Sequence, residues 1–250
     1  MTINNMYFIA NWKMYGDLSS IKSINNVISL AKLKRYSKAK IIYCPPSTLL
    51  EAFIKKTKKT KISIGAQNCH YESDYGPYTG SISSKMIKSL GSKFVIIGHS
   101  ENRKEGDTDL KINMKINSAI KSNLNVIFCI GETLKERKNK KTFKVLKNQI
   151  RKGLNKIIKI EKLIIAYEPI WSIGTGLIPN LKELNENINQ ILKIIKPLKN
   201  SKKIKIIYGG SVKPSNVKEL SRISGINGFL IGGASINSKN FIDIIKKSIN

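Results

Sequence analysis

Short apolar runs alternate with amphipathic segments along the chain. Eight such runs occur, at residues 7–10, 41–43, 62–66, 94–97, 126–130, 163–167, 204–208 and 228–231. The runs are read as continuous rather than alternating, although Ser63 and Lys205 interrupt two of them, and continuous runs are typical of strands buried on both faces of a parallel sheet. The intervening segments repeat apolar residues at helical spacing, as in Ile21, Ile24, Ile28 and Ala31, or Leu184, Ile188, Ile191 and Ile195.

This alternation predicts eight strand–helix units. Parallel strands need crossover connections, and the intervening helices provide them. Eight units in 250 residues suit a closed barrel better than an open doubly wound sheet. We therefore expect an α/β fold with a single domain over residues 1–250, in which eight parallel strands are ringed by helices. The longest connection without a clear helix, residues 67–84, is expected to be functional or to mediate an interaction.

Composition narrows the class of protein. Hydrophobic residues make up 41% of the chain, and no apolar run reaches the roughly 18 residues of a membrane span. Residues 1–5 lack the basic and apolar regions of a signal peptide, so none is expected. The cysteines Cys44, Cys69 and Cys129 are widely spaced, which argues against a disulfide framework or a zinc site and favours a reducing cytosol.

The net charge is +29, from 45 Lys and Arg against 16 Asp and Glu. Taken alone, this excess indicates a nucleic-acid partner. The lysines, however, are scattered over every predicted helix, and arginine, the commoner base-reading residue, is scarce. A solvated basic surface is therefore favoured over a nucleic-acid interface, and its positive field would attract a dianionic substrate.

Barrel enzymes place their chemistry where strands end. Asn11, Trp12 and Lys13 follow the first run. Because residues i and i+2 of an extended segment share a face, Asn11 and Lys13 can both point into the barrel mouth, with Trp12 packed the other way. Lys13 would then supply a fixed positive charge for an anionic ligand. A surface lysine at a strand end is the alternative.

One of the two histidines, His99, follows the fourth run. If a helix starts at Ser100, its N-terminal dipole disfavours the imidazolium and keeps His99 neutral. A neutral imidazole can donate a hydrogen bond to a carbonyl and to a developing enediolate oxygen. A histidine of the core or the surface is the alternative.

A glutamate, Glu168, leaves the sixth run directly into a loop that begins with Pro169 and contains Gly174 and Gly176. Partial desolvation raises the pKa of such a carboxyl and makes it a usable general base. Proline and glycine suit a stiff loop tip that moves on hinges. The alternative is a surface glutamate followed by a turn.

Paired glycines follow the last two runs, at residues 209–210 and 232–233. Glycine lets backbone N–H groups approach an anion, and a following helix start adds its dipole. Two such turns after adjacent strands predict a phosphate site.

These segments together resemble the triosephosphate isomerase family. The most specific motifs are AYEPIWSIGTG at 166–176, GHSE at 98–101, CIGE at 129–132 and YGGSV at 208–212. The resemblance implies a (β/α)8 TIM barrel and an intramolecular oxidoreductase that interconverts dihydroxyacetone phosphate and D-glyceraldehyde 3-phosphate. It further implies roles in glycolysis and gluconeogenesis, a cytoplasmic location, and no cofactor or metal.

The resemblance also assigns roles to residues. Glu168 matches the base, and His99 matches the neutral electrophile. Lys13 matches the cation that steadies the enediolate, with Glu101 as its partner. The substrate and phosphate ligands would be Asn11, Lys13, Gly174, Ser211, Gly232 and Gly233. Residues 169–179 resemble a closing lid, and Leu177-Ile178-Pro179 departs from the usual hinge sequence.

Residues 67–84 resemble the family's dimer loop. The resemblance implies a homodimer held through Gln67, Tyr78 and Thr79. Ser81 and Asn102 stand where the family often has a Glu and an Arg that pair across subunits, so a dimer weaker than typical is expected. Two alternative functions remain open at this point: another phosphosugar-processing barrel enzyme, and a basic nucleic-acid-binding protein.

Overall fold

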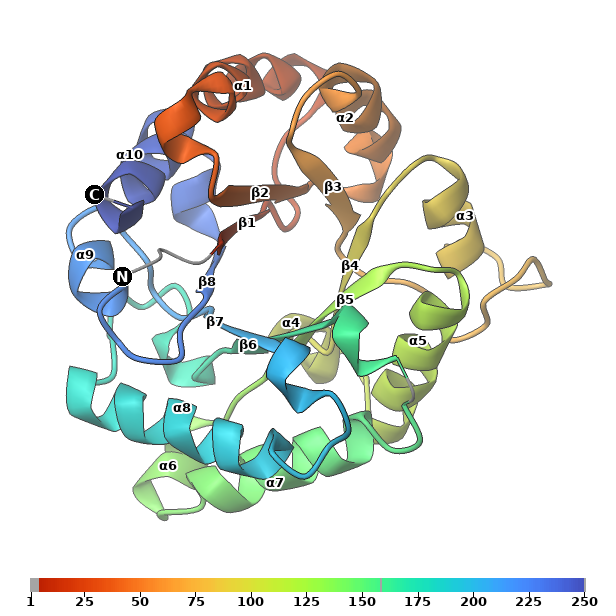
Figure 1. Ribbon diagram of the computed structural model, residues 1–250. Coiled ribbons are helices and arrows are strands. Elements are labelled where there is room, and N and C mark those ends of the chain that lie inside the picture. Colours follow the sequence, from red (N-terminus) through yellow and green to blue (C-terminus); the bar gives the residue numbers. More distant parts are fainter. Residues whose placement is uncertain (1–4, 158, 250) are drawn as a thin grey trace.

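Eight parallel strands close into a barrel in which neighbours in sequence are neighbours in space (Figure 1). The computed structural model describes residues 5–157 and 159–249. The strands are β1 (Met6–Asn11), β2 (Ala39–Cys44), β3 (Ser63–Ala66), β4 (Phe94–Ile97), β5 (Asn125–Ile130), β6 (Leu163–Tyr167), β7 (Lys205–Tyr208) and β8 (Gly228–Ile231). The predicted eight-stranded parallel barrel is confirmed. The expectation that residues 1–5 form no signal peptide falls mostly on residues 1–4, which lie outside the part of the chain that the structure describes.

Helices surround the barrel on its outer side (Figure 1). They are α1 (Ile24–Lys32), α2 (Leu50–Thr57), α3 (Ser84–Ser89), α4 (Ser100–Lys104), α5 (Asp109–Lys121), α6 (Leu134–Lys138), α7 (Thr142–Gly153), α8 (Leu181–Ile195), α9 (Val217–Leu220) and α10 (Ser238–Ile249). In α8 the buried residues are the four whose spacing predicted the helix. The periodicity therefore identified the face that packs on the barrel.

The ends of some elements differ slightly from the prediction. Ile62 and Ile204 are buried but precede their strands, because the ladder with the neighbouring strand begins at Ser63 and Lys205. Ile21 lies in a short 3₁₀ helix before α1. These shifts leave the order and number of predicted strands unchanged.

Side chains of the strands alternate between two layers. The barrel interior is filled by Ile9, Ile42, Cys44, Ile96, Ile127, Cys129, Ile164, Ala166, Ile207 and Leu230. The intervening strand residues pack outward against the helices. Since residues i and i+2 share a face, the inward set continues from Ile9 to Asn11 at the end of β1 and from Ala166 to Glu168 just beyond β6. The pleat of the strands thus aims polar side chains into the barrel mouth.

Trp12 belongs to the outer layer and is 1% exposed. Its ring makes edge contacts with Tyr43 and Phe53, with centroids 6.0 Å and 5.1 Å away. Trp12 therefore packs away from the barrel mouth, as predicted. This aromatic cluster fixes the backbone at the end of β1, where Asn11 and Lys13 flank it.

We expect Phe53→Ala to lower the free energy of unfolding by about 3–5 kcal/mol, because truncating a buried ring leaves a cavity against Trp12. Urea denaturation followed by circular dichroism measures the change. The control Leu110→Ala truncates a side chain that is 71% exposed and is expected to change stability by less than about 0.5 kcal/mol. Similar losses in the two variants would contradict the packing described for Phe53.

Candidate active site

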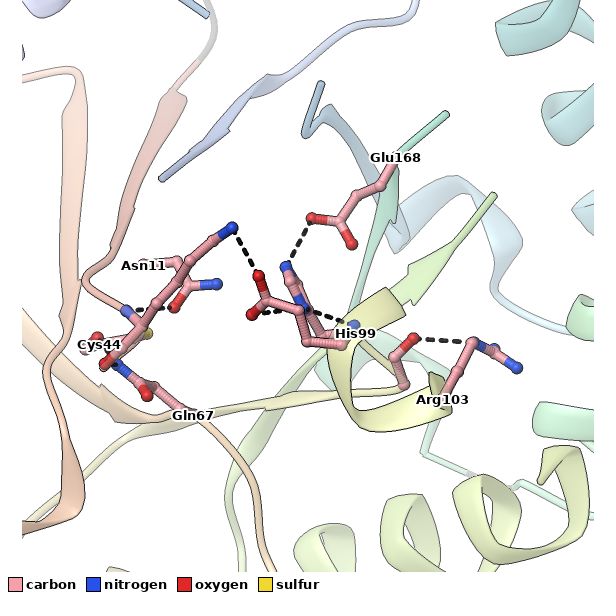
Figure 2. A network of polar contacts seen from close by, with 9 residues as sticks. Asn11, Cys44, Gln67, His99, Arg103 and Glu168 are labelled. Carbon is pink, nitrogen blue, oxygen red and sulfur yellow. Dashed lines mark hydrogen bonds and ion pairs between the residues drawn. The ribbon is translucent and has the colours of Figure 1, made fainter. Parts of the chain in front are cut away.

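A cavity of about 220 Å³ lies beyond the carboxyl ends of the barrel strands. All of the residues that the sequence assigned to catalysis and phosphate binding line it: Asn11, Lys13, His99, Glu168, Gly174, Ser211, Gly232 and Gly233. Figure 2 shows the side chains of Asn11, His99 and Glu168 arranged around one common space. Residues more than a hundred positions apart in the chain therefore meet at one end of the barrel.

The backbone after β1 is strained at Lys13. Its φ of +52° lies in the left-handed region, which costs a residue with a side chain about 1–2 kcal/mol. The Lys13 N–H donates to Asn11 Oδ1 (3.1 Å), and the Gln67 amide donates to the carbonyl oxygens of Lys13 (2.8 Å) and Cys44 (2.9 Å). These bonds stabilise the turn that carries the Lys13 side chain into the cavity.

The Lys13 ammonium donates a hydrogen bond to Glu101 Oε1 at 2.7 Å, so the expected pair is present. The same Nζ atom lies 3.9 Å from the position that a Cβ would occupy on Gly232. One cation therefore contacts a carboxylate on one side and approaches the glycine turn after β8 on the other. The pair with Glu101 compensates part of the charge that Lys13 brings to the cavity.

His99 caps the N-terminus of α4, which begins at Ser100 as predicted. The ring Nδ1 accepts a hydrogen bond from the Glu101 N–H (3.3 Å), which places the ring proton on Nε2. Arg103 holds this turn by donating from Nε to the carbonyl oxygen of Gly98 (2.8 Å), a contact drawn in Figure 2. The imidazole consequently presents an N–H donor to the cavity, the tautomer that the predicted electrophile requires.

Glu168 is 3% exposed, and its Oε1 lies 3.5 Å from His99 Nε2 (Figure 2). Burial raises the pKa of the Glu168 carboxyl above 4.5, and His99, the Cys129 thiol and Lys13 partly oppose this rise. The second oxygen, Oε2, is buried and forms no well-aligned hydrogen bond with any described residue. A desolvated carboxylate with an unpaired oxygen can take a proton from a bound ligand.

The glycine turns after β7 and β8 differ in what they contact. A Cβ on Gly209 would lie 2.6 Å from the Glu168 Cγ atom, so only glycine fits beside this carboxylate. A Cβ on Gly233 would have nothing within 4 Å, so that turn is open. Open backbone N–H groups at a glycine turn are suited to bind an anion such as phosphate.

Residues 169–179, the predicted lid, form a compact unit with internal hydrogen bonds. The Ser172 hydroxyl donates to the carbonyl oxygen of Leu177 (2.6 Å), and the Thr175 hydroxyl donates to that of Trp171 (3.0 Å). Gly174 at its tip lines the cavity. These internal bonds hold residues 171–177 together as one unit at the edge of the cavity.

Two contacts join this segment to the turn after β7, and the sequence analysis did not foresee them. The Ser172 hydroxyl lies 3.1 Å from the Tyr208 hydroxyl and accepts a hydrogen bond from the Ser211 N–H (3.3 Å). Tyr208 ends β7 and was read only as part of a motif. Its position as the last residue of a strand is the signal that identifies it.

Glu132 anchors the first turn of the predicted lid, and the sequence analysis missed this role as it missed that of Tyr208. Its fully buried carboxylate accepts hydrogen bonds from Trp171 Nε1 (3.0 Å) and the Tyr167 hydroxyl (3.2 Å). Burial raises the pKa of the Glu132 carboxyl, and the same donors oppose the rise. The Arg137 guanidinium stacks over Trp171 and pairs with Glu183. The signal for Glu132 is a carboxylate two residues beyond β5.

Other candidate chemistry is limited in the described part of the chain. Residues 5–157 and 159–249 hold no group of three His, Cys, Asp or Glu side chains that could bind a metal ion. No helix among them is long and apolar enough to cross a membrane. Cys44, Cys69 and Cys129 are buried free thiols.

Comparison with known proteins gives a consistent result. The family model for triosephosphate isomerase matches residues 6–248. The chain is 44% identical to a triosephosphate isomerase of Dictyoglomus thermophilum, over 95% of this chain and 97% of the relative. It is 41% identical to one from Clostridium botulinum strain Okra, over 94% and 96%. A crystal structure of triosephosphate isomerase from Bartonella henselae superposes with a TM-score of 0.89 at 35% identity, covering 98% of this chain and all of that one.

We expect Glu132→Gln to change how stability depends on pH. A folded-state pKa raised above the unfolded value of about 4.5 means that stability is complete below that value and is lost as pH rises through the folded pKa. Glutamine does not ionise, so the variant escapes this loss. Urea unfolding measures the free energy of unfolding of both proteins at pH 4 and pH 7. Relative to the unmodified protein, Glu132→Gln is expected to be more stable at pH 7 than it is at pH 4. A difference that is the same at both pH values would contradict the burial of a charged Glu132.

Proposed function

Because the chain belongs to the triosephosphate isomerase family, it interconverts dihydroxyacetone phosphate and D-glyceraldehyde 3-phosphate, and we propose that Glu168, His99 and Lys13 perform this reaction. The activity is an aldose–ketose isomerisation and a step of glycolysis. The observation that carries the proposal is the convergence of a buried carboxylate, an imidazole N–H and an ammonium on one cavity of about 220 Å³.

In the proposed mechanism, Glu168 Oε2 takes a proton from the carbon next to the substrate carbonyl. The electron pair moves onto the carbonyl oxygen and gives an enediolate. His99 Nε2 donates its proton to that oxygen and then transfers a proton between the two oxygens, while Lys13 and the Asn11 amide hold them. Glu168 returns its proton to the neighbouring carbon. The support for Glu168 is its desolvation and its unpaired oxygen, and that for His99 is its tautomer.

We propose that backbone N–H groups at Gly174, Ser211, Gly232 and Gly233 bind the substrate phosphate. All four residues line the cavity with the catalytic side chains. Closure of residues 169–179 would exclude water and surround the phosphate. That exclusion matters because an exposed enediolate eliminates phosphate. The Ser172 hydroxyl supports a link between lid closure and phosphate binding, since it contacts both Leu177 of the lid and the Ser211 N–H.

We further propose a homodimer formed through residues 67–84, with Gln67, Tyr78 and Thr79 at the interface. This connection extends outward beyond α3 (Figure 1). Tyr75 and Tyr78 are 69% and 39% exposed, and Met14, after the first strand, is 94% exposed. The exposed aromatic side chains on the projecting loop, and the exposed Met14 elsewhere on the chain, support an interaction surface. Gln67 would act indirectly, because its amide is engaged within the chain at Lys13 and Cys44.

The remaining proposals concern the chain as a whole. We propose one domain over residues 1–250, which the single closed barrel supports. We propose a cytoplasmic location, which the free thiols of the cysteines support, since thiols persist in a reducing compartment.

Glu168→Gln is expected to lower kcat by at least about a hundredfold, because an amide cannot accept the substrate proton. The inhibition constant of inorganic phosphate is expected to stay within about twofold, since the substitution keeps the shape of the side chain. A coupled assay with dihydroxyacetone phosphate measures both quantities. Turnover comparable to that of the unmodified enzyme would refute the role of Glu168 as the base.

The pH profile of kcat/KM is the internal control for this variant. Only the ionised carboxylate accepts a proton, so activity of the unmodified enzyme is expected to fall as pH drops through the folded pKa of Glu168, which lies above 4.5. The residual activity of Glu168→Gln is expected to lack this acidic limb. An unchanged limb in the variant would assign it to another group.

We expect a dimer weaker than is typical of the family, because Ser81 and Asn102 lack the charges that pair across subunits. Analytical ultracentrifugation over a range of concentrations measures the dissociation constant. Tyr78→Asp is expected to shift the equilibrium further toward monomer, by placing a charge on the proposed interface. The control Tyr36→Phe changes a tyrosine that is 2% exposed and is expected to leave association unchanged. Undiminished affinity in the unmodified protein would oppose this prediction.

A further inference from the structure

Four titratable side chains line the cavity: Lys13, His99, Glu168 and Lys213. Lys13 is already paired with Glu101 at 2.7 Å. Glu168 brings a negative charge when it is ready to act as a base. Lys213, by contrast, has no carboxylate within 4 Å among the residues that the structure describes. It is therefore the cavity cation whose charge no neighbouring acid compensates.

The backbone of Lys213 is held firmly. Its N–H donates to Asn216 Oδ1 (2.9 Å), and the Asn216 amide donates back to the carbonyl oxygen of Ser211 (2.9 Å). The carbonyl oxygen of Lys213 accepts hydrogen bonds from the N–H groups of Asn216 (3.2 Å) and Val217 (3.1 Å). This arrangement fixes where the lysine side chain starts, two residues beyond the proposed phosphate ligand Ser211.

The side chain of Lys213 reaches toward the predicted lid. Its Nζ atom lies 3.5 Å from the position that a Cβ would take on Gly176, and Gly176 has a φ of +80°. No side chain therefore stands between the ammonium and the lid backbone. Lys213 therefore carries a cation from the segment after β7 to Gly176 of residues 169–179, and these are two of the segments proposed to enclose the phosphate.

We propose that Lys213 is a substrate-binding residue whose ammonium pairs directly with the dianionic phosphate of the triose. This inference rests on the proposed phosphate site at Ser211, Gly232 and Gly233, and adds a side-chain cation to those backbone donors. Without Lys213, the only side-chain cation available to the dianionic phosphate in this cavity would be Lys13, whose charge Glu101 already partly compensates. A cation that the closing lid removes from water attracts the phosphate more strongly than an exposed charge does.

The test measures competitive inhibition by inorganic phosphate at low ionic strength. Lys213→Gln is expected to raise the inhibition constant by about five- to tenfold, between the effects of an exposed and an enclosed charge pair. Lys213→Arg is expected to retain affinity within about twofold. Lys218→Gln, an exposed lysine on α9, is the control for the general positive field and is expected to change the constant by less than twofold.

Further measurements separate the possible outcomes. Turnover of glyceraldehyde, which lacks the phosphate, is expected to be unchanged in Lys213→Gln, and an equal loss there would overturn the inference as a structural effect. Equal effects of Lys213→Gln and Lys218→Gln would also overturn it. Gly233→Val, which places a side chain in the open turn, tests the phosphate site itself. If Gly233→Val weakens the binding of phosphate and Lys213→Gln does not, the inference about Lys213 fails and the proposed phosphate site stands. If neither variant weakens the binding of phosphate, the proposed phosphate site fails as well.

Discussion

Burial of the Glu168 carboxylate is the constraint on which the rest of the site depends. The side chain is 3% exposed, and one of its oxygens has no well-aligned hydrogen bond among the described residues. Such desolvation destabilises the charged form and raises the carboxyl pKa, unless nearby positive charge and donors compensate. His99 and Lys13 provide that compensation without forming a tight ion pair with Glu168. The Glu168 carboxyl can therefore ionise despite its burial, and its unpaired oxygen remains able to accept a proton.

The surrounding structure maintains this balance through contacts away from the cavity. The left-handed turn at Lys13 is stabilised by the Gln67 amide, and the His99 turn is held by Arg103. Glu132 anchors the first turn of residues 169–179 through Trp171. Each of these supports comes from a different strand end or helix, so the precision of the site reflects the rigidity of the closed barrel. The mobile part of the proposed mechanism is confined to one short segment between fixed ends.

The excess of positive charge over the whole protein is represented in this cavity by only a few charged side chains. A net charge of +29 is spread over the surface, but the cavity contains one paired cation, Lys13, one cation without a neighbouring carboxylate, Lys213, and one acid, Glu168. A dianionic substrate therefore experiences a general attraction from the whole protein and specific contacts only inside the barrel mouth. Membership in the triosephosphate isomerase family accounts for the cavity and its small-molecule substrate.

The sequence alone determined the strand count, the barrel, and the residues that carry the proposed chemistry, because continuous apolar runs mark buried strands and the catalytic types stand just after them. It determined that Asn11 and Lys13 share a face, since that follows from the pleat of an extended chain. Only the tertiary structure showed that Glu132, Tyr208 and Lys213 lie at the cavity or contact the segment that covers it. Their contacts join segments that are distant in the chain, and no local pattern encodes the distance between Lys213 and Gly176 or the depth at which Glu168 is buried. Closure of the barrel fixes those distances, which is why they emerge only once all eight strands are in place.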